Sequence, residues 1–254
     1  MIFFNIGLWD ILLVIVVTAM ATTLAYLHEP KFKAAIITLP LPFTLAILAV
    51  GRPLDSTNII ALVLLLGYTH AVRLLYNKFH WPIIVSIVTA AIGYCLAGAI
   101  LVRVLPSCKV FFWISSLIVL GVGIILYIKH PYRKEPGSRT LLPVWVKASI
   151  IITVVLCLVL IKKWLVGFMT VFPMVGVVAS YEARNSLWTI CRQMSIVIIT
   201  MSAMMMVCYF TQYHVGIGLS LVLGWGVFLV IFIPLTRFMW KQEKKIIKGE
   251  VSDE

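Results

Sequence analysis

Charged residues are scarce in this chain: they make up 12% of its 254 residues, about half the share typical of a soluble domain. Acidic residues are scarcer still, with 9 Asp and Glu against 21 Lys and Arg. The sequence has no P-loop, no dinucleotide fingerprint and no HExxH or HxxxH pair. Its five cysteines form no CxxC pair, and most lie in apolar runs, where cysteine behaves as a small hydrophobe. We therefore expect no catalytic residues, metal site, cofactor or disulfide framework.

The chain is rich in long apolar runs. Hydrophobic residues make up 62% of it, and the mean hydropathy is +1.09. About 20 apolar residues are needed for a helix to cross a bilayer, and backbone facing lipid must bond internally, which favours helices. The first run lacks a basic leader and a cleavage motif, so we interpret it as a retained helix. The runs predict an all-α integral membrane protein with nine transmembrane helices at 8–27, 33–50, 57–76, 82–104, 110–129, 143–162, 164–181, 187–209 and 215–239.

The net charge of +12 comes mainly from basic residues in the short breaks between these spans. This distribution indicates contact with the anionic head groups of a lipid bilayer rather than with nucleic acid. An odd number of spans places the two ends of the chain on opposite sides of the membrane. The side of the C-terminal end then carries fourteen basic residues and the other side five. The positive-inside rule therefore predicts a multi-pass protein of the inner (plasma) membrane, with the N-terminus outside and the C-terminus cytoplasmic.

The chain also contains an internal repeat. Each half opens a span with a Trp, continues into a span interrupted by proline, and then reaches a polar turn that begins with Arg. Setting Arg52 on Arg184 places Thr57 on Thr189 and keeps the flanking spans in step. We therefore divide the chain into a four-helix unit, a linker helix with a basic loop, a second four-helix unit and a charged tail. These are residues 1–104, 105–142, 143–240 and 241–254.

Four spans and one linker helix place the second unit upside down relative to the first. Inverted repeats are common in secondary transporters, where paired proline-broken helices mark the substrate site. Pro40, Pro42 and Pro173 interrupt matching spans and are candidates to line such a site, although membrane helices also tolerate proline without a functional reason. The inversion depends on a true break at Lys162 and Lys163, because without it the count falls to eight.

Several short motifs of the second unit match a known pattern. These are Val146-Lys147-Ala148, Phe172-Pro173, Ser180-Tyr181-Glu182-Ala183-Arg184 and Arg192. With these motifs the unit resembles the GlpM-type small four-helix bacterial inner-membrane proteins, over about residues 143–239, with a fainter echo over 8–104. The chain departs from the pattern in separating Glu182 from Arg184, and in having Asp10 where the second unit has Lys147. The resemblance implies two tandem units and a loose association with exopolysaccharide production.

Ionisable residues inside spans are costly and are candidates for function. Arg192 and Lys147 are both cationic, so beside the proline breaks they suit an anionic ligand such as a carboxylate or phosphate. The alternative is that both side chains snorkel to the head groups. Glu182 and Arg184 are expected to pair locally rather than to catalyse a reaction. The candidate substrate-binding residues are Arg192, Lys147, Pro40, Pro173, Arg52, Arg184 and Glu182.

One helix face carries sulfur at helical spacing, from Met194, Met201, Met205 and Cys208. Soft sulfur ligands suit Cu(I). A Met stripe is far more often a packing surface, which is the interpretation we favour.

The pattern as a whole predicts a membrane transporter or flippase-like protein for a small anionic or lipid-linked substrate. The alternative is a non-transporting integral membrane subunit of an envelope or exopolysaccharide assembly complex, and an enzyme acting on lipid intermediates ranks third. Other membrane proteins, or further copies of the chain, are possible partners. Transport predicts a polar, water-accessible cavity around Arg192. A scaffold predicts a dry core in which Arg192 is bonded to a neighbour or to lipid phosphate.

Overall fold

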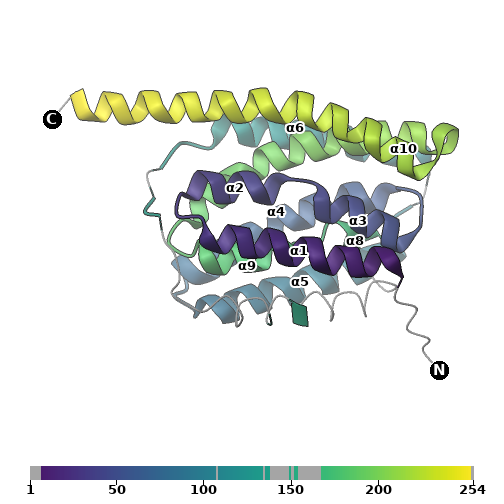
Figure 1. The fold of residues 1–254 in the computed structure, drawn as a ribbon, viewed down its shortest axis with the longest axis horizontal. Helices are drawn as coiled ribbons and strands as arrows, with labels where there is room; N and C mark the ends of the chain where they lie inside the picture. The colour runs from purple at the N-terminus through teal and green to yellow at the C-terminus, as the bar shows by residue number, and fades with distance from the viewer. Residues whose placement is uncertain are drawn as a thin grey trace.

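The computed structural model describes residues 7–106, 108–133, 135–137, 149, 152–153 and 167–252. Within these residues the secondary structure is α-helical throughout. The helices lie side by side along one direction and form a single bundle, as Figure 1 shows. Their bounds are α1 Leu8–Tyr26, α2 Pro30–Thr38, α3 Leu41–Val50, α4 Ser56–Asn77, α5 Ile83–Val104, α6 Lys109–Lys129, α8 Gly167–Thr170, α9 Met174–Glu182 and α10 Leu187–Ser252.

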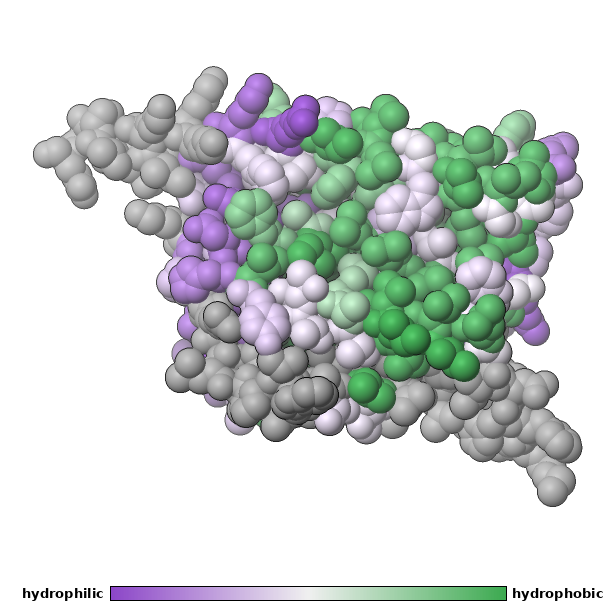
Figure 2. All heavy atoms as spheres, in the orientation of Figure 1, coloured by the Kyte–Doolittle hydropathy of each residue, from purple (hydrophilic) through white to green (hydrophobic). Residues whose placement is uncertain are grey.

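Six helical stretches of the described residues are long and apolar enough to cross a membrane. The last of them, Leu187–Glu243, has 57 residues, more than twice the roughly 20 that one crossing needs. The surface in Figure 2 is hydrophobic over much of the bundle, and its hydrophilic residues gather toward the ends. The all-α class is therefore confirmed, and the helices agree with a multi-pass membrane protein. The count of nine is not confirmed, because most of the predicted span 143–162 and the break at 162–163 lie outside the described residues.

The helix ends follow local sequence signals. Pro30 begins α2 at a position where its missing N–H costs nothing. Gly51 ends α3 in the left-handed conformation, with φ of 66°, which favours glycine. Asp55 caps α4: its Oδ1 accepts from the Thr57 N–H at 2.8 Å, and its own N–H donates to Asn58 Oδ1 at 2.8 Å. These signals are why the predicted spans begin and end close to the observed helices.

Helix α10 is interrupted by one residue, Gly216, where φ is 79° and ψ is 164°. The chain turns back there, so α10 has two arms that lie together along one side of the bundle (Figure 1). The break between the predicted spans 187–209 and 215–239 is placed slightly too early, because residues 210–214 are helical and the turn lies at Gly216, where glycine adopts these backbone angles without strain. The second arm continues to Ser252, so much of the predicted charged tail is helical.

Small residues allow close helix packing in two places. A Cβ built at Gly123 of α6 would lie 2.8 Å from Ile198 Cγ2 on the first arm of α10. A Cβ built at Gly224 on the second arm would lie too close to Cys208 Sγ on the first arm. Such contacts replace the hydrophobic driving force that is absent between helices in lipid. They hold α6 and both arms of α10 against one another.

Candidate functional site

Two helices are broken near the middle of the bundle. The first break separates α2 from α3 at Leu39 and Pro40, and the second separates α8 from α9 at residues 171–173. Pro42 has no N–H, so the Thr38 carbonyl lacks the donor that a continuous helix would supply four residues later. In the second break, Met174 N donates to Phe172 O at 2.7 Å instead of continuing a helix. Proline and the residues around it thus expose backbone carbonyls inside the bundle.

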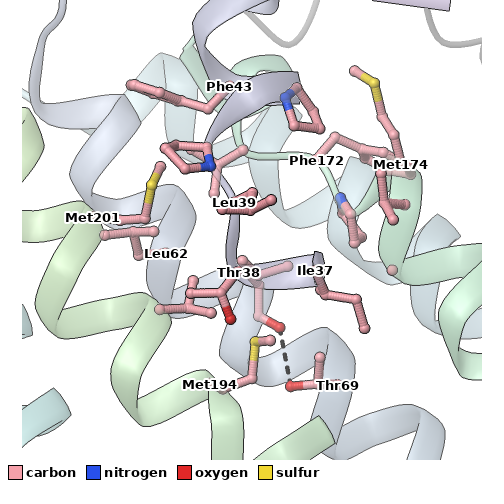
Figure 3. A pocket seen from close by; sticks show the side chains of 18 of the residues that line it. Ile37, Thr38, Leu39, Phe43, Leu62, Thr69, Phe172, Met174, Met194 and Met201 are labelled. Atoms are coloured by element: carbon pink, nitrogen blue, oxygen red, sulfur yellow. Dashed lines mark hydrogen bonds between the residues drawn. The ribbon is translucent and has the colours of Figure 1, made fainter. Parts of the chain in front are cut away.

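The two breaks line one cavity of about 70 Å³, which we call the break cavity. Figure 3 shows Leu39 and Phe43 from the first break on one side, with Phe172 and Met174 from the second break on the other. Among the described residues, the lining has threonines as its polar side chains and contains no charged residue. It consists of Ile37, Thr38, Leu39, Pro40, Pro42, Phe43, Leu62, Leu65, Thr69, Thr170, Val171, Phe172, Pro173, Met174, Val175, Gly176, Ile190, Met194, Val197 and Met201.

A threonine at the start of each break accepts a hydrogen bond from an amide side chain of another helix. Gln193 Nε2 donates to Thr38 Oγ1 at 2.8 Å, and Asn58 Nδ2 donates to Thr170 Oγ1 at 2.9 Å. Both threonines are buried, so these bonds satisfy groups that would be costly to leave unpaired. Thr170 follows Thr38 by the same number of residues by which Arg184 follows Arg52. The two breaks therefore lie at matching positions when Arg52 is aligned with Arg184, and each is held by a hydrogen bond from an amide side chain.

Of the predicted site residues, Pro40 and Pro173 meet at the break cavity. Arg192 does not line it. Its side chain is only 9% exposed, and it forms an ion pair with Glu243 on the second arm of α10. Its guanidinium also lies over the ring of Tyr132, 5.5 Å from the ring centroid.

Glu182 is 1% exposed at the C-terminal end of α9. Its backbone oxygen accepts a hydrogen bond from Lys33 Nζ at 2.9 Å. Lys33 is itself 1% exposed on α2, so it neutralises partial negative charge at the end of α9. Lys33 is the first residue of the predicted span 33–50. Pro30, three residues earlier, is the signal that the helix begins before it.

The other predicted site residues lie apart. Arg184 is half-buried, with its guanidinium 5.6 Å from the centroid of the Tyr181 ring. Arg52 is exposed beside Gly51, at the end of the bundle opposite Arg192. Lys147 lies outside the described residues. Of the predicted cations, the three that the structure describes, Arg52, Arg184 and Arg192, do not line the break cavity.

A larger pocket of about 530 Å³ opens beside the Arg192–Glu243 pair, and we call it the polar pocket. Its volume falls in the range of about 300–1,000 Å³ that is common for small-molecule sites. Both Glu243 and Tyr132, the two contacts of Arg192, line it. The lining mixes acidic, basic and aromatic side chains: His28, Glu29, Pro30, Lys31, Phe32, Tyr132, Arg133, Glu135, Gly137, Thr189, Trp240 and Glu243.

The described residues contain no group of three His, Cys, Asp or Glu side chains that could hold a metal ion. Of the sulfur-bearing face, Met194 and Met201 line the break cavity, while Met205 is fully buried in the core. The Cys208 thiol donates to the Ser220 carbonyl at 3.2 Å. These contacts are those of a packing surface.

Comparison with known proteins gives no assignment: the chain matches no family model, no curated protein sequence and no solved structure.

Proposed function

We propose that this protein is a membrane transporter or flippase-like protein for a small anionic or lipid-linked substrate. The observation that carries the proposal is that the two proline-broken helices meet and line one cavity. Breaking a helix inside a bilayer is costly unless the freed backbone groups find partners or line a cavity. Two such breaks at one place are typical of transporter substrate sites.

The matched threonine contacts support the proposed inverted repeat. Thr38 and Thr170 hold equivalent places in the two halves, and each bonds an amide on a helix of the other half. Under this proposal the two halves rock against each other about the breaks, with the linker helix α6 between them. The proposed orientation places Arg192, Lys33 and the polar pocket on the cytoplasmic side. The proposal also includes the resemblance of the second unit to the GlpM-type small bacterial inner-membrane proteins.

Within the proposed substrate class, a lipid-linked molecule suits the lining better than a small free anion. The described residues place no charged side chain in the lining of the break cavity, and a free anion there would lose its hydration without a counter-charge from them. An apolar chain would lose nothing in contact with Phe43, Phe172 and Met201. The polar pocket supplies a separate place for a polar head group.

The alternative, a non-transporting subunit of an assembly complex, is favoured by one observation. At about 70 Å³ the break cavity holds only a few water molecules, and Arg192 is bonded to Glu243, as expected of a scaffold. Transport requires this cavity to open, whereas a scaffold functions with the cavity closed.

Reconstituted vesicles test the proposal. Purified protein is placed in vesicles containing fluorescent phosphatidylglycerol or a fluorescent prenyl phosphate, and the probe on the outer leaflet is bleached with dithionite. We expect the protein to expose inner-leaflet probe to bleaching faster than empty vesicles do. Thr38→Trp, which fills the break cavity, should abolish the difference. Thr23→Trp, on the exposed face of α1, should retain it.

A second measurement separates a transporter from a scaffold. Thr38→Cys and Thr170→Cys are treated with a water-soluble thiol reagent in a background that carries Cys108→Ser, since Cys108 is exposed. Reaction at either cysteine shows that water enters the cavity. If neither reacts and neither probe moves faster than in empty vesicles, the transport proposal is wrong and the scaffold remains.

A further inference from the structure

Two arginines lie against one tryptophan where α4 ends and α10 begins. The guanidinium carbon of Arg73 is 4.5 Å from the centroid of the Trp188 ring, and that of Arg133 is 4.6 Å from it. Arg73 is near the end of α4, Arg133 follows α6, and Trp188 is in the first turn of α10. We call this cluster the arginine–tryptophan site. Stacking of guanidinium on indole is favourable and leaves the N–H groups at the guanidinium edges available to bind an anion.

The loop that carries Arg133 is fixed at both of its ends. Trp188 Nε1 donates to the Pro131 carbonyl at 3.0 Å. Two residues after Arg133, Glu135 caps α10: its oxygens accept from the N–H groups of Trp188 at 3.1 Å and Thr189 at 2.7 Å. Arg133 is therefore held in place by its neighbours rather than by an ion pair of its own.

The charge of the site is not balanced within the described part of the chain. Both oxygens of Glu135 are engaged in capping α10, and the structure gives neither Arg73 nor Arg133 an ion pair with a described acid. His130 lies beside Trp188, with ring centroids 5.2 Å apart, and its buried Nδ1 has no hydrogen-bond partner among the described residues. Burial lowers the pKa of His130, and nearby cations, including Arg73 and Arg192, lower it further. The site is thus a place of positive potential.

The site also borders a face that is suited to lipid chains. Leu74, next to Arg73, is 43% exposed, and on the last turns of α6 Ile125 is 53% and Ile128 76% exposed. Helices α4 and α6 pack against each other, and each has exposed apolar side chains near its C-terminal end. Tryptophan is enriched at the level of lipid head groups, where Trp188 would lie.

We propose that the arginine–tryptophan site binds the head group of an anionic phospholipid from the surrounding bilayer. The phosphate accepts hydrogen bonds from Arg73 and Arg133, and the acyl chains lie along the exposed residues of α4 and α6. Arginine suits phosphate because its planar group donates two parallel hydrogen bonds, and basic pockets between membrane helices are recurrent lipid sites. This lipid site does not depend on the proposed transport function.

Native mass spectrometry and thermal unfolding in detergent test the inference on the full chain. We expect phosphatidylglycerol to bind and to raise the unfolding temperature more than phosphatidylcholine does. The double variant Arg73→Gln, Arg133→Gln should weaken phosphatidylglycerol binding by at least about tenfold, since each basic residue near a membrane surface contributes about a factor of five. The double variant Lys78→Gln, Lys129→Gln removes the same charge from exposed ends of the same helices and should bind nearly as the wild type.

Three results would overturn the inference. The arginine variant would bind phosphatidylglycerol as the wild type does, or the lysine variant would lose as much binding as the arginine variant, which indicates diffuse attraction. Alternatively, inorganic phosphate would stabilise the wild type as much as the lipid, which indicates a free anion as the ligand.

If the double arginine variant does not fold, Arg133→Gln alone replaces it, because Arg133 is exposed and lies outside the helices. It should weaken binding by about fivefold, and unchanged binding would contradict the proposal.

Discussion

Arg192 near the start of α10 forms an ion pair with Glu243 near its end, so the two arms of this helix are joined at the end opposite Gly216. The side chains are only 9% and 12% exposed. A partly buried pair of this kind is costly to break, because removing one partner leaves the other charge unpaired.

We therefore expect Arg192→Gln and Glu243→Gln each to destabilise the protein by about 3 kcal/mol, and the double variant to cost less than the two single changes together. Thermal unfolding in detergent measures this. Glu29→Gln breaks the exposed pair with Lys31 and should cost at most about 1 kcal/mol. Additive costs of the two single variants would show that the pair contributes no coupling.

The two arms of α10 are also expected to depend on Gly224. Gly224→Ala would place a methyl group against Cys208 Sγ and 3.0 Å from Met204 Cγ, so we expect a loss of about 2 kcal/mol from overpacking. Gly226→Ala, two residues later, meets nothing within 4 Å and is the matched control. Unfolding temperatures of the two variants that do not differ would contradict the close approach of the arms.

Gln212 joins α10 to the turn before α4 through both backbone groups of Leu54. Its Oε1 accepts from the Leu54 N–H at 2.7 Å, and its Nε2 donates to the Leu54 carbonyl at 3.1 Å. We expect Gln212→Ala to destabilise the protein by about 2 kcal/mol, because two buried backbone groups lose their partners. Gln242→Ala, at an exposed position of the same helix, should stay within about 0.5 kcal/mol of the wild type in chemical unfolding.

His130 predicts a dependence of stability on pH. Its pKa is lowered in the folded protein, chiefly by burial. The unfolded chain therefore binds a proton more readily than the folded one, and His130 destabilises the fold as the pH falls below about 6.5. We expect the unfolding temperature to drop between pH 7.5 and 5.5, and His130→Asn to reduce that drop. His80→Asn changes an exposed histidine and should leave the drop as it is.

Much of the helical pattern is readable from the sequence, because bilayer thickness and proline act locally. The apolar runs predict α1, α4, α5 and α6 to within a few residues, and Pro40 and Pro173 predict where helices break. Contacts between distant residues are not readable in this way. Nothing near Arg192 in the sequence indicates that Glu243 neutralises it, and nothing near Lys33 indicates that it reaches the end of α9.

The same limit applies to the candidate site. The proposed repeat predicts that both proline breaks face one site, and both line the break cavity. The sequence does not separate the break cavity from the polar pocket, since that separation depends on which way Arg192 points. A side-chain direction set by a partner fifty residues away has no local signature.

The second arm of α10 leaves the bundle as one continuous helix that runs past the ends of the other helices (Figure 1). A chain of 28.5 kDa has little mass outside the detergent or lipid belt by which single particles are aligned in electron cryomicroscopy. The helix has no described break after Gly216. A rigid helical protein fused in register beyond Ser252 would therefore continue in the same direction. The protein thus carries its own attachment arm for imaging, by which the break cavity can be examined in a bilayer without an antibody fragment.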